Sequence, residues 1–310
     1  MIPYIKVPDL PIGPITIHPF GILVATGVLV GTAIAARRAK SLGYDLGLFN
    51  SFVTWMLVGG FIGGHVLDQL SYHWDEVVKH PYSLLTLWTG LSSFGGFIGA
   101  TTGAVLWKYF DWNRGFRVRR QVLPILPFAD VVQAVFPVAW IFGRSGCSVV
   151  HDHRGAKAPP DTLVAVTYPF DEHNITEPLD KIGFVQLVHG SVPRYDLGLL
   201  ELMFTCVLAL MFALTWKRKL PIGMYLVVAA FAYSPVRFVM DFLRVPESEG
   251  GDTRYAHLTP AQWSCTALFL VGVVVLVNMI RFKRSGVDLG ERLRAVAPQP
   301  SVEPDAPLVR

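Results

Sequence analysis

Seven long apolar runs constrain this chain more than any other feature of its sequence. Apolar residues make up 52% of the 310 residues and charged residues only 16%, with a mean hydropathy of +0.43. A helix needs about 20 predominantly apolar residues to cross a lipid bilayer. The sequence therefore predicts an all-α polytopic membrane protein of about seven transmembrane helices, with a small mixed extracytoplasmic head domain. The predicted spans are residues 20–36, 49–70, 84–109, 122–142, 197–216, 222–243 and 261–280.

Positive charge predicts how these spans are oriented. Lysine and arginine gather after the first, third, fifth and seventh spans, and positively charged loops stay in the cytoplasm. We therefore expect the amino terminus outside and the carboxyl terminus in the cytoplasm. The net charge of +4 then records membrane topology, and nucleic-acid binding is not expected. The clusters are Arg37, Arg38 and Lys40; Lys108, Arg114, Arg117, Arg119 and Arg120; Lys217, Arg218 and Lys219; and Arg281, Lys283 and Arg284.

One polar segment interrupts the apolar pattern. Residues 156–196 are rich in polar residues and proline, and Leu163–Tyr168 and Phe184–Val188 are typical of short strands. The sequence therefore predicts four regions. Residues 1–155 hold transmembrane helices 1–4 and the active-site stretch, 156–196 form the extracytoplasmic head, 197–282 hold helices 5–7, and 283–310 form a disordered cytoplasmic tail.

The stretch Phe142–Gly155 brings chemically active side chains to the outer end of the fourth span. It contains two arginines, two histidines, an aspartate and a thiol within 14 residues. Its cysteine, Cys147, lies far in sequence from Cys206 and Cys265, so neither a disulfide framework nor a zinc site is expected. No metal or organic cofactor is indicated. A site of this composition suits chemistry at a lipid headgroup.

A second polar group lies on the sixth span. Tyr233, Arg237 and Asp241 follow one another at intervals of four residues and Arg244 comes three later, so they share one helix face. Arg237 would lie roughly 10 Å below the membrane surface, which is costly unless the charge is paired or wetted. Asp241 could simply neutralise an arginine. However, Arg144 adds a second guanidinium from another helix, and two guanidiniums together suit a phosphate group.

These segments resemble the bacterial prolipoprotein diacylglyceryl transferases. Gly143-Arg144-Ser145-Gly146 through Asp152 to Gly155 is similar to the family signature G-R-x-G-N-F-x-N-G-E. Further similar segments follow in the family's order and extend the resemblance over nearly the whole chain. They are Gly90–Gly96, Asp130 with the fourth span, Tyr233–Phe238, Asp241–Pro246 and Leu258–Trp263.

The resemblance implies an activity, its substrates and a cellular location. The diacylglyceryl group of phosphatidylglycerol would pass to the lipobox cysteine of a prolipoprotein, forming a thioether and releasing glycerol phosphate, at the outer face of the bacterial inner membrane. Arg144 and Arg237 match arginines essential to the family, and Tyr233 matches its functional tyrosine. The residues expected to bind substrate are Gly95, Gly96, Gly143, Arg144, Gly146, Cys147, Asp152, Gly155 and Arg237.

Several positions depart from the family pattern. Phe94 replaces the histidine often proposed as the base for the thiol, Cys147 replaces an asparagine, Asp152 a glutamate and Phe20 a tyrosine. His151 or His153 could replace the missing base, or could merely shape the headgroup pocket.

Other roles also stay open. Cys147 is either a transient nucleophile or a small packing residue, and Glu201 is expected to hold a helix. The departures leave an alternative function, that of a non-catalytic lipid- or lipoprotein-binding membrane protein on the same scaffold.

Overall fold

The computed structural model describes residues 1–13, 15–86, 90–111, 115–119, 122–171, 175–218 and 220–284. The chain divides into two compact units. The first unit comprises Met1–Ala35, Val132–Leu220 and Met224–Leu276, and the second comprises Ala36–Val131, Pro221–Gly223 and Val277–Arg310. The predicted disordered tail from residue 285 onward lies outside the described residues.

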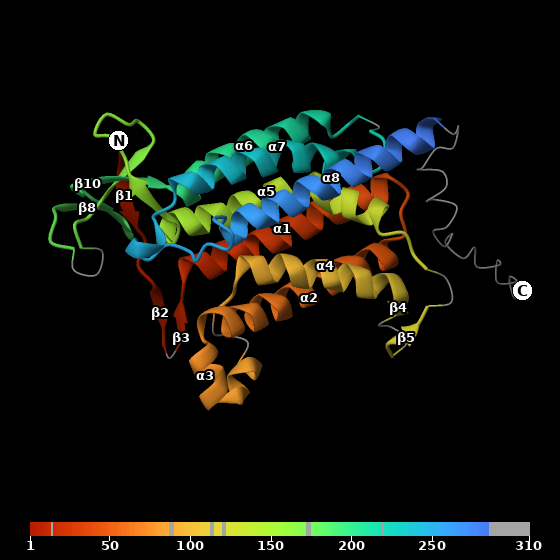
Figure 1. Ribbon diagram of the computed structural model, residues 1–310, viewed down its shortest axis with the longest axis horizontal. Coiled ribbons are helices and arrows are strands. Elements are labelled where there is room, and N and C mark those ends of the chain that lie inside the picture. Colours follow the sequence, from red (N-terminus) through yellow and green to blue (C-terminus); the bar gives the residue numbers. More distant parts are fainter. Residues whose placement is uncertain are drawn as a thin grey trace, which may run out of the picture. The chain divides into compact units, whose positions relative to one another are not determined.

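Six of the described helices are long and apolar enough to cross a membrane, as expected for a polytopic membrane protein. Five of them contribute to the first unit (Figure 1). They are α1 (Pro19–Ser41), α5 (Leu126–Val150), α6 (Leu197–Thr215), α7 (Met224–Met240, continued by the 3₁₀ turn Asp241–Leu243) and α8 (Pro260–Arg284).

Small residues let the helices of the first unit approach closely. Gly27 and Gly31 of α1 face Ala139 of α5, and Gly272 of α8 faces Ala230 of α7, in each case without room for a further methyl group. Close helix contact through small residues is the usual way in which membrane helices pack. Larger side chains of α5, α6 and α7 form a buried cluster that contains Ala134, Leu208, Phe212, Tyr225 and Ala229.

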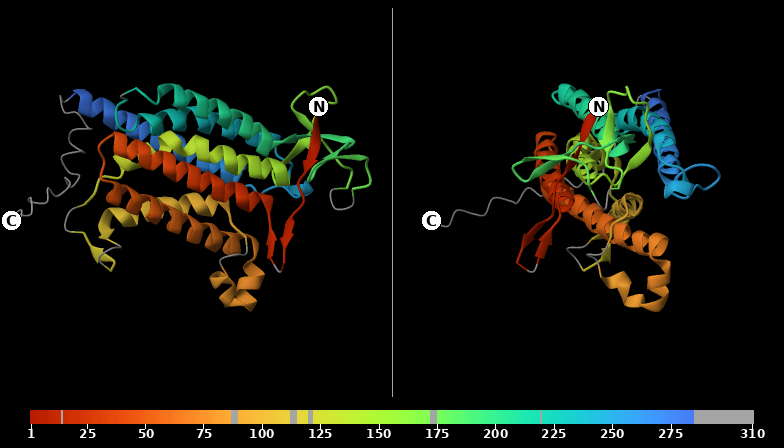
Figure 2. Two further views of the ribbon diagram at one scale, coloured as in Figure 1. Left: turned by 180° about the vertical axis from the view of Figure 1, so that it is seen from behind. Right: turned by 90° about the vertical axis from the view of Figure 1, so that its left-hand side faces the viewer.

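A six-stranded mixed sheet lies beyond the ends of α5, α6 and α7 within the first unit (Figures 1 and 2). Its order is β6-β10-β7-β1-β9-β8, in which β1 runs parallel to β7 and the other neighbours are antiparallel. The strands are β1 (Ile2–Lys6), β6 (Arg154–Lys157), β7 (Ala165–Tyr168), β8 (Leu179–Ile182), β9 (Val185–Val188) and β10 (Val192–Asp196).

The sheet is larger than the sequence pattern indicated. Both predicted strands are present as β7 and β9, but β1 comes from the amino terminus and β6 begins inside the signature stretch. Tyr4 of β1 packs against Val166, Tyr168 and Val188 and ties the first residues of the chain to the sheet. The hairpin of β2 (Leu10–Ile12) and β3 (Ile15–Ile17) then leads to α1.

The second unit is built on two helices joined by glycines, α2 (Leu46–Tyr72) and α4 (Ser93–Tyr109). A methyl group on Gly99 of α4 would overlap the backbone of Gly59, and one on Gly63 would lie 2.7 Å from the backbone oxygen of Gly95. The unit also contains α3 (Trp74–Lys79), the 3₁₀ turn η1 (Pro81–Leu85), and the short strands β4 (Phe110–Asp111) and β5 (Arg117–Val118).

The third predicted span is shorter than expected. Residues 84–109 were expected to form the third span, with an interfacial piece before Gly90 as an open alternative. Helix α4 begins only at Ser93, where the Ser92 side chain caps it by accepting a hydrogen bond from Gly95 N. With 17 residues, α4 is shorter than the six candidate spans, of which the shortest is α6 with 19 residues when α7 is counted together with its 3₁₀ turn. The count of seven spans therefore stays a prediction.

Candidate active site

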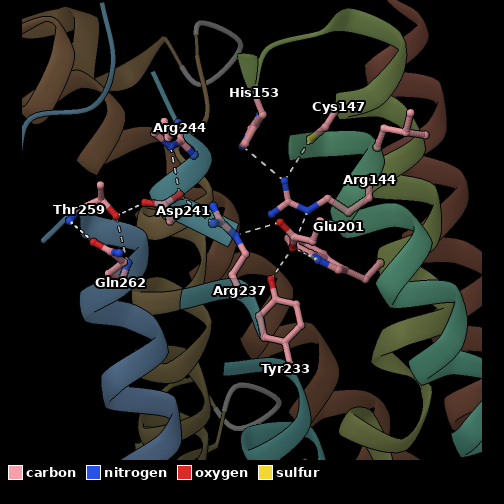
Figure 3. Close-up of polar contacts among 12 residues, drawn as sticks. Arg144, Cys147, His153, Glu201, Tyr233, Arg237, Asp241, Arg244, Thr259 and Gln262 are labelled. Carbon is pink, nitrogen blue, oxygen red and sulfur yellow. Dashed lines mark hydrogen bonds and ion pairs between the residues drawn. The ribbon is translucent and has the colours of Figure 1, made fainter. Parts of the chain in front are cut away.

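Two arginines from different helices meet at one buried carboxylate (Figure 3). Arg144, near the carboxyl end of α5, places Nε 2.8 Å from Oε1 of Glu201 in α6. Arg237, near the end of α7, places its Nε 2.9 Å from the other oxygen of the same carboxylate. The two arginine side chains are 6% exposed and the Glu201 side chain 1%. The two guanidiniums therefore converge on Glu201, while the phosphate site predicted from the sequence stays a prediction.

Two further side chains hold Glu201 in place. The Tyr233 hydroxyl, one turn before Arg237, donates a hydrogen bond to Oε1 of Glu201, and Trp140 Nε1 donates to the same oxygen at 3.1 Å. Trp140 also lies under the Arg144 guanidinium, with 4.7 Å between Cζ and the ring centre, a cation–π contact. Glu201 thus links α5, α6 and α7 and fixes the orientation of both arginines.

A second carboxylate, Asp241, lies one turn beyond Arg237. Its Oδ1 is 2.7 Å from Arg237 Nη1 and 3.1 Å from Arg244 Nε, so it pairs with both arginines named in the sequence pattern. The Thr259 hydroxyl donates to its Oδ2, and Gln262 Oε1 accepts from the backbone N–H of Thr259 at 3.0 Å. These contacts tie the start of α8 to the end of α7. Arg144, Glu201, Tyr233, Arg237, Asp241 and Arg244 are called the arginine cluster below.

Arg144 has N–H groups that are poorly satisfied by its hydrogen-bond partners. Its Nε is buried, and its N–H finds no hydrogen-bond acceptor among the described residues, because the contact with Glu201 is an ion pair out of line for a hydrogen bond. Its Nη1 makes only long contacts, 3.5 Å to Cys147 Sγ and 3.4 Å to His153 Nε2. A buried, poorly satisfied guanidinium is a ready site for an anionic oxygen.

The backbone brings these groups together at the ends of three helices, α5, α6 and α7. Helix α5 stops after Val150 because His151 adopts a left-handed conformation, with φ of 53°, a common way of ending a helix. Asp196 caps the start of α6 by accepting from Leu199 N at 2.9 Å. Pro235 lies inside α7, which gives way to a 3₁₀ turn at Asp241. Charged side chains are therefore gathered where helices begin or end.

The two histidines of the signature stretch have different surroundings. His151 is buried, with Nδ1 2.6 Å from Asp196 Oδ2 and Nε2 3.0 Å from the Ile5 carbonyl oxygen. Each ring nitrogen of His151 therefore faces a fixed acceptor. Its ring stacks on Tyr4 with 3.9 Å between centroids. His151 therefore fastens β1 and α6 to the end of α5.

His153 instead faces the arginine cluster. Its Nδ1 is 2.5 Å from Asp152 Oδ1, and its Nε2 points to Arg144 Nη1. The His153 side chain is 21% exposed and the Asp152 side chain 41%, so the pair lies at the rim between solvent and the buried guanidiniums. Of the two candidate bases, His153 is the one that contacts the arginine cluster.

Cys147, Asp152 and His153 form the group of residues best suited to hold a metal ion. One ligand atom from each lies within 4.8 Å of the others, a thiol, a carboxylate and an imidazole. The guanidinium of Arg144 already contacts two of the three, Cys147 and His153. A positive charge in that place fits an anionic substrate better than a cation.

Three of the predicted glycines, Gly95, Gly146 and Gly155, lie at points of close packing. A side chain on Gly146 would meet the Phe20 ring of α1 at 2.8 Å, and one on Gly155 would meet backbone oxygens of Tyr195 and Leu243 at 2.5 and 2.9 Å. Gly143 has the Trp140 ring as its nearest neighbour, at 3.7 Å. Gly95 and Gly96 belong to α4 of the second unit, facing α2.

Sequence reasoning underrated Glu201. It was expected to hold a helix rather than to take part in the chemistry, and it is the residue on which both arginines converge. The available signal was its type and place: an ionisable side chain inside an otherwise apolar run, where such residues are functional by default. Trp140, Thr259 and Gln262 were not singled out for the site, because nothing in their spacing marks them.

Comparison with known proteins identifies the family of this chain. A family model described as prolipoprotein diacylglyceryl transferase matches residues 9–278. A phosphatidylglycerol–prolipoprotein diacylglyceryl transferase of Azoarcus sp. (strain BH72) is 25% identical over 284 residues, covering 89% of this chain and 95% of the relative. Relatives of the same name from Rhodopseudomonas palustris, at 27% identity, and Acinetobacter baumannii, at 25%, cover 87% and 84% of this chain and 88% of their own lengths. The chain belongs to the prolipoprotein diacylglyceryl transferase family.

Proposed function

We propose that this protein transfers the diacylglyceryl group of phosphatidylglycerol to the cysteine thiol of a prolipoprotein lipobox, forming a thioether and releasing glycerol phosphate. The observation that carries the proposal is the convergence of Arg144 and Arg237 on Glu201. Burying an arginine is costly unless it is paired. Arg237 pairs with both Glu201 and Asp241, whereas Arg144 has Glu201 as its ion-pair partner among the described residues and keeps donors for an anion. The family name and the names of the relatives support the same activity.

The arginines would act on the leaving group. As sulfur bonds to the glyceryl carbon, the carbon–oxygen bond breaks and its electrons pass to the phosphate. Guanidiniums aimed at that phosphate stabilise the developing charge, and preorganised donors of this kind are often the largest contribution to catalysis. Arg144 would exchange its long contacts with Cys147 and His153 for phosphate oxygens. Tyr233 would act by holding Glu201, and hence both arginines, in position.

The membrane arrangement follows from the same proposal. The six long helices together with α4 would give seven spans, with the amino terminus outside and the carboxyl terminus in the cytoplasm. The six-stranded sheet would then be the extracytoplasmic head, and the arginine cluster would open to the outer face of the bacterial inner membrane. Prolipoproteins would reach the arginine cluster from the outer face, after export across the membrane.

Labelled substrates test the function directly. Phosphatidylglycerol carrying one label in its acyl chains and another in its headgroup glycerol is incubated with the purified protein and a lipobox peptide. We expect the acyl label on the peptide as a thioether and the headgroup label in free glycerol phosphate, and neither with a peptide whose cysteine is replaced by serine. Both labels remaining on the lipid would instead support a lipid- or lipoprotein-binding protein without catalysis.

A further inference from the structure

The proposed transfer needs a group that accepts the thiol proton. A cysteine thiol ionises near pH 8.5, so at pH 7 only a few per cent is the reactive thiolate. The base must lie next to the arginine cluster, because the carbon under attack is attached to the phosphate held there. It must also be reachable from outside the protein, where the peptide arrives.

Most candidate bases of the cluster are already occupied. Glu201 is 1% exposed and is held by Arg144, Arg237, Tyr233 and Trp140. Asp241 is fully buried and held by Arg237, Arg244 and Thr259. Both ring nitrogens of His151 face fixed acceptors, the Asp196 carboxylate and the Ile5 carbonyl oxygen. None of these groups can take a proton without breaking the contacts that hold the helices together.

His153 has the geometry that these others lack. The Asp152 carboxylate can only accept a hydrogen bond, so His153 Nδ1 carries the proton in their 2.5 Å contact. The Arg144 guanidinium can only donate, so Nε2 presents its lone pair toward the cluster in their 3.4 Å contact. The hydrogen-bond partners thus select one neutral tautomer, with its basic nitrogen facing the place where we position the phosphate.

The backbone also fixes where this base stands. The His153 carbonyl oxygen accepts a hydrogen bond from Leu197 N at 3.0 Å, which anchors the residue at the start of α6, four residues before Glu201. Arg144 lies one short turn from Cys147 in α5, and its Nη1 contacts both Cys147 and His153 (Figure 3). The charged and titratable groups facing His153 are therefore Arg144, Cys147 and Asp152.

We propose that His153, oriented by Asp152, is the general base that takes the proton from the lipobox thiol. The proposal rests on the proposed function and names the residue that completes its chemistry. The thiol proton moves to Nε2, sulfur forms the bond to the glyceryl carbon, and the carbon–oxygen electrons go to the phosphate. His153 then passes the proton to the departing glycerol phosphate, so no further reactant is needed.

Comparing His153→Ala with the wild type on a thiol peptide and on a selenol peptide isolates the proton-transfer step. For His153→Ala at pH 7, we expect transfer to the thiol peptide to fall about 10²- to 10⁴-fold, the usual contribution of a positioned base. A peptide carrying selenocysteine is already ionised at that pH and needs no base, so its transfer should fall less than about tenfold. Phosphatidylglycerol binding should be unchanged.

Two further measurements separate a base from a structural residue. Raising the pH above about 8.5 ionises the thiol without help, so His153→Ala should recover toward the wild-type rate, and added imidazole should restore activity at pH 7. Asp152→Asn should show the same alkaline recovery. His189→Ala is the matched control, because His189 pairs with Asp180 at 2.8 Å on the sheet, and it should not alter the rate.

Three results would overturn the assignment. The first is a His153→Ala variant that transfers to the thiol peptide at the wild-type rate. The second is an equal loss of transfer to the thiol and selenol peptides. The third is a loss of phosphatidylglycerol binding in this variant, which would make His153 a structural residue. In each case a wild-type protein that forms the thioether keeps the proposed function. A wild-type protein that forms no product would instead contradict the function itself.

Discussion

Two buried polar clusters of the first unit use similar residues for different ends. The arginine cluster places three arginines around Glu201 and Asp241, and Arg144 is left with long contacts and an unsatisfied Nε. The second, which we call the histidine clamp, consists of Tyr4, His151, Tyr168 and Asp196. In this clamp, the polar contacts of His151 with Asp196 and the Ile5 carbonyl oxygen, and those of Asp196 with Tyr168 and Leu199 N, are each 3.0 Å or shorter.

The difference between the two clusters separates a network that stabilises the fold from one that can bind a ligand. A buried network whose members are all satisfied makes the fold rigid, and nothing in it is available to a ligand. A buried network with spare donors is costly to the fold and becomes favourable when an anion completes it. The clamp fastens the amino-terminal strand and two helix ends, so that the arginine cluster beside it can stay incomplete. Matched substitutions in the two clusters test this division.

Removing the charge of Glu201 should have the largest effect. Glu201→Gln leaves Arg144 and Arg237 without their shared anion, and breaking a buried ion pair costs about 3–5 kcal/mol of folding free energy. The arginines also lose their fixed position, so transfer per folded molecule should fall by roughly 10²-fold. Unfolding in detergent and the thioether assay measure the two effects. A variant that loses stability but keeps full turnover would make Glu201 a purely structural residue.

Removing the charge of Asp196 should affect stability alone. Asp196 accepts from His151, Tyr168 and the backbone of Leu199, so Asp196→Asn should lower the free energy of unfolding by about 3 kcal/mol. Transfer per folded molecule should match the wild type, because the clamp contributes no group to the reaction. Reduced turnover in the folded fraction would erase the distinction between the two clusters.

Substituting one tyrosine in each cluster repeats this comparison with a smaller expected effect on stability. Tyr168 donates to Asp196 at 3.0 Å and Tyr233 donates to Glu201, so each phenol serves one cluster carboxylate. Replacing either by phenylalanine removes one hydrogen bond and should cost about 1 kcal/mol of stability. Only Tyr233→Phe should slow transfer, by roughly fivefold, measured with saturating lipid. Equal transfer rates in Tyr168→Phe and Tyr233→Phe would contradict a positioning role for Tyr233.

A glycine of the second unit should show the smallest effect on folding. A methyl group on Gly96 would approach the Gly60 carbonyl oxygen at 3.8 Å, an ordinary contact, whereas one on Gly99 would overlap the Gly59 backbone. Gly96→Ala should therefore fold normally, while Gly99→Ala should lose about 1–3 kcal/mol. If Gly96 touches the lipid, as its family motif implies, Gly96→Ala should raise KM in a fully folded protein. An unchanged KM would remove Gly96 from the substrate-binding set.

The sequence was most informative where a single segment carries the signal. Apolar length located the long helices, and the spacing of Tyr233, Arg237 and Asp241 predicted their common face. Contacts between distant segments were not readable in the same way. On its own helix Glu201 has no charged neighbour, only the hydroxyl of Thr205 one turn on, so its partners became visible only when α5 and α7 were placed beside α6.

Long-range pairing also explains the misjudged extent of the sheet. Ile2–Lys6 is short, and its partners β7 and β9 lie more than 150 residues away, so no local pattern marks it as a central strand. The two histidines could not be told apart for the same reason. His151 contacts the Ile5 carbonyl oxygen and Asp196, which are both distant in sequence. His153 contacts its neighbour Asp152 and Arg144, which lies nine residues earlier in α5.

A double-mutant cycle on phosphatidylglycerol binding tests most directly whether Arg144 and Arg237 hold one phosphate. Affinity is measured for the wild type, Arg144→Ala, Arg237→Ala and the double variant, each checked for folding. Because both guanidiniums would contact one group, we predict that the loss in the double variant differs from the sum of the single losses by about 0.5–3 kcal/mol. Losses that add within about 0.5 kcal/mol would show that the two arginines act independently, and would contradict the shared phosphate site.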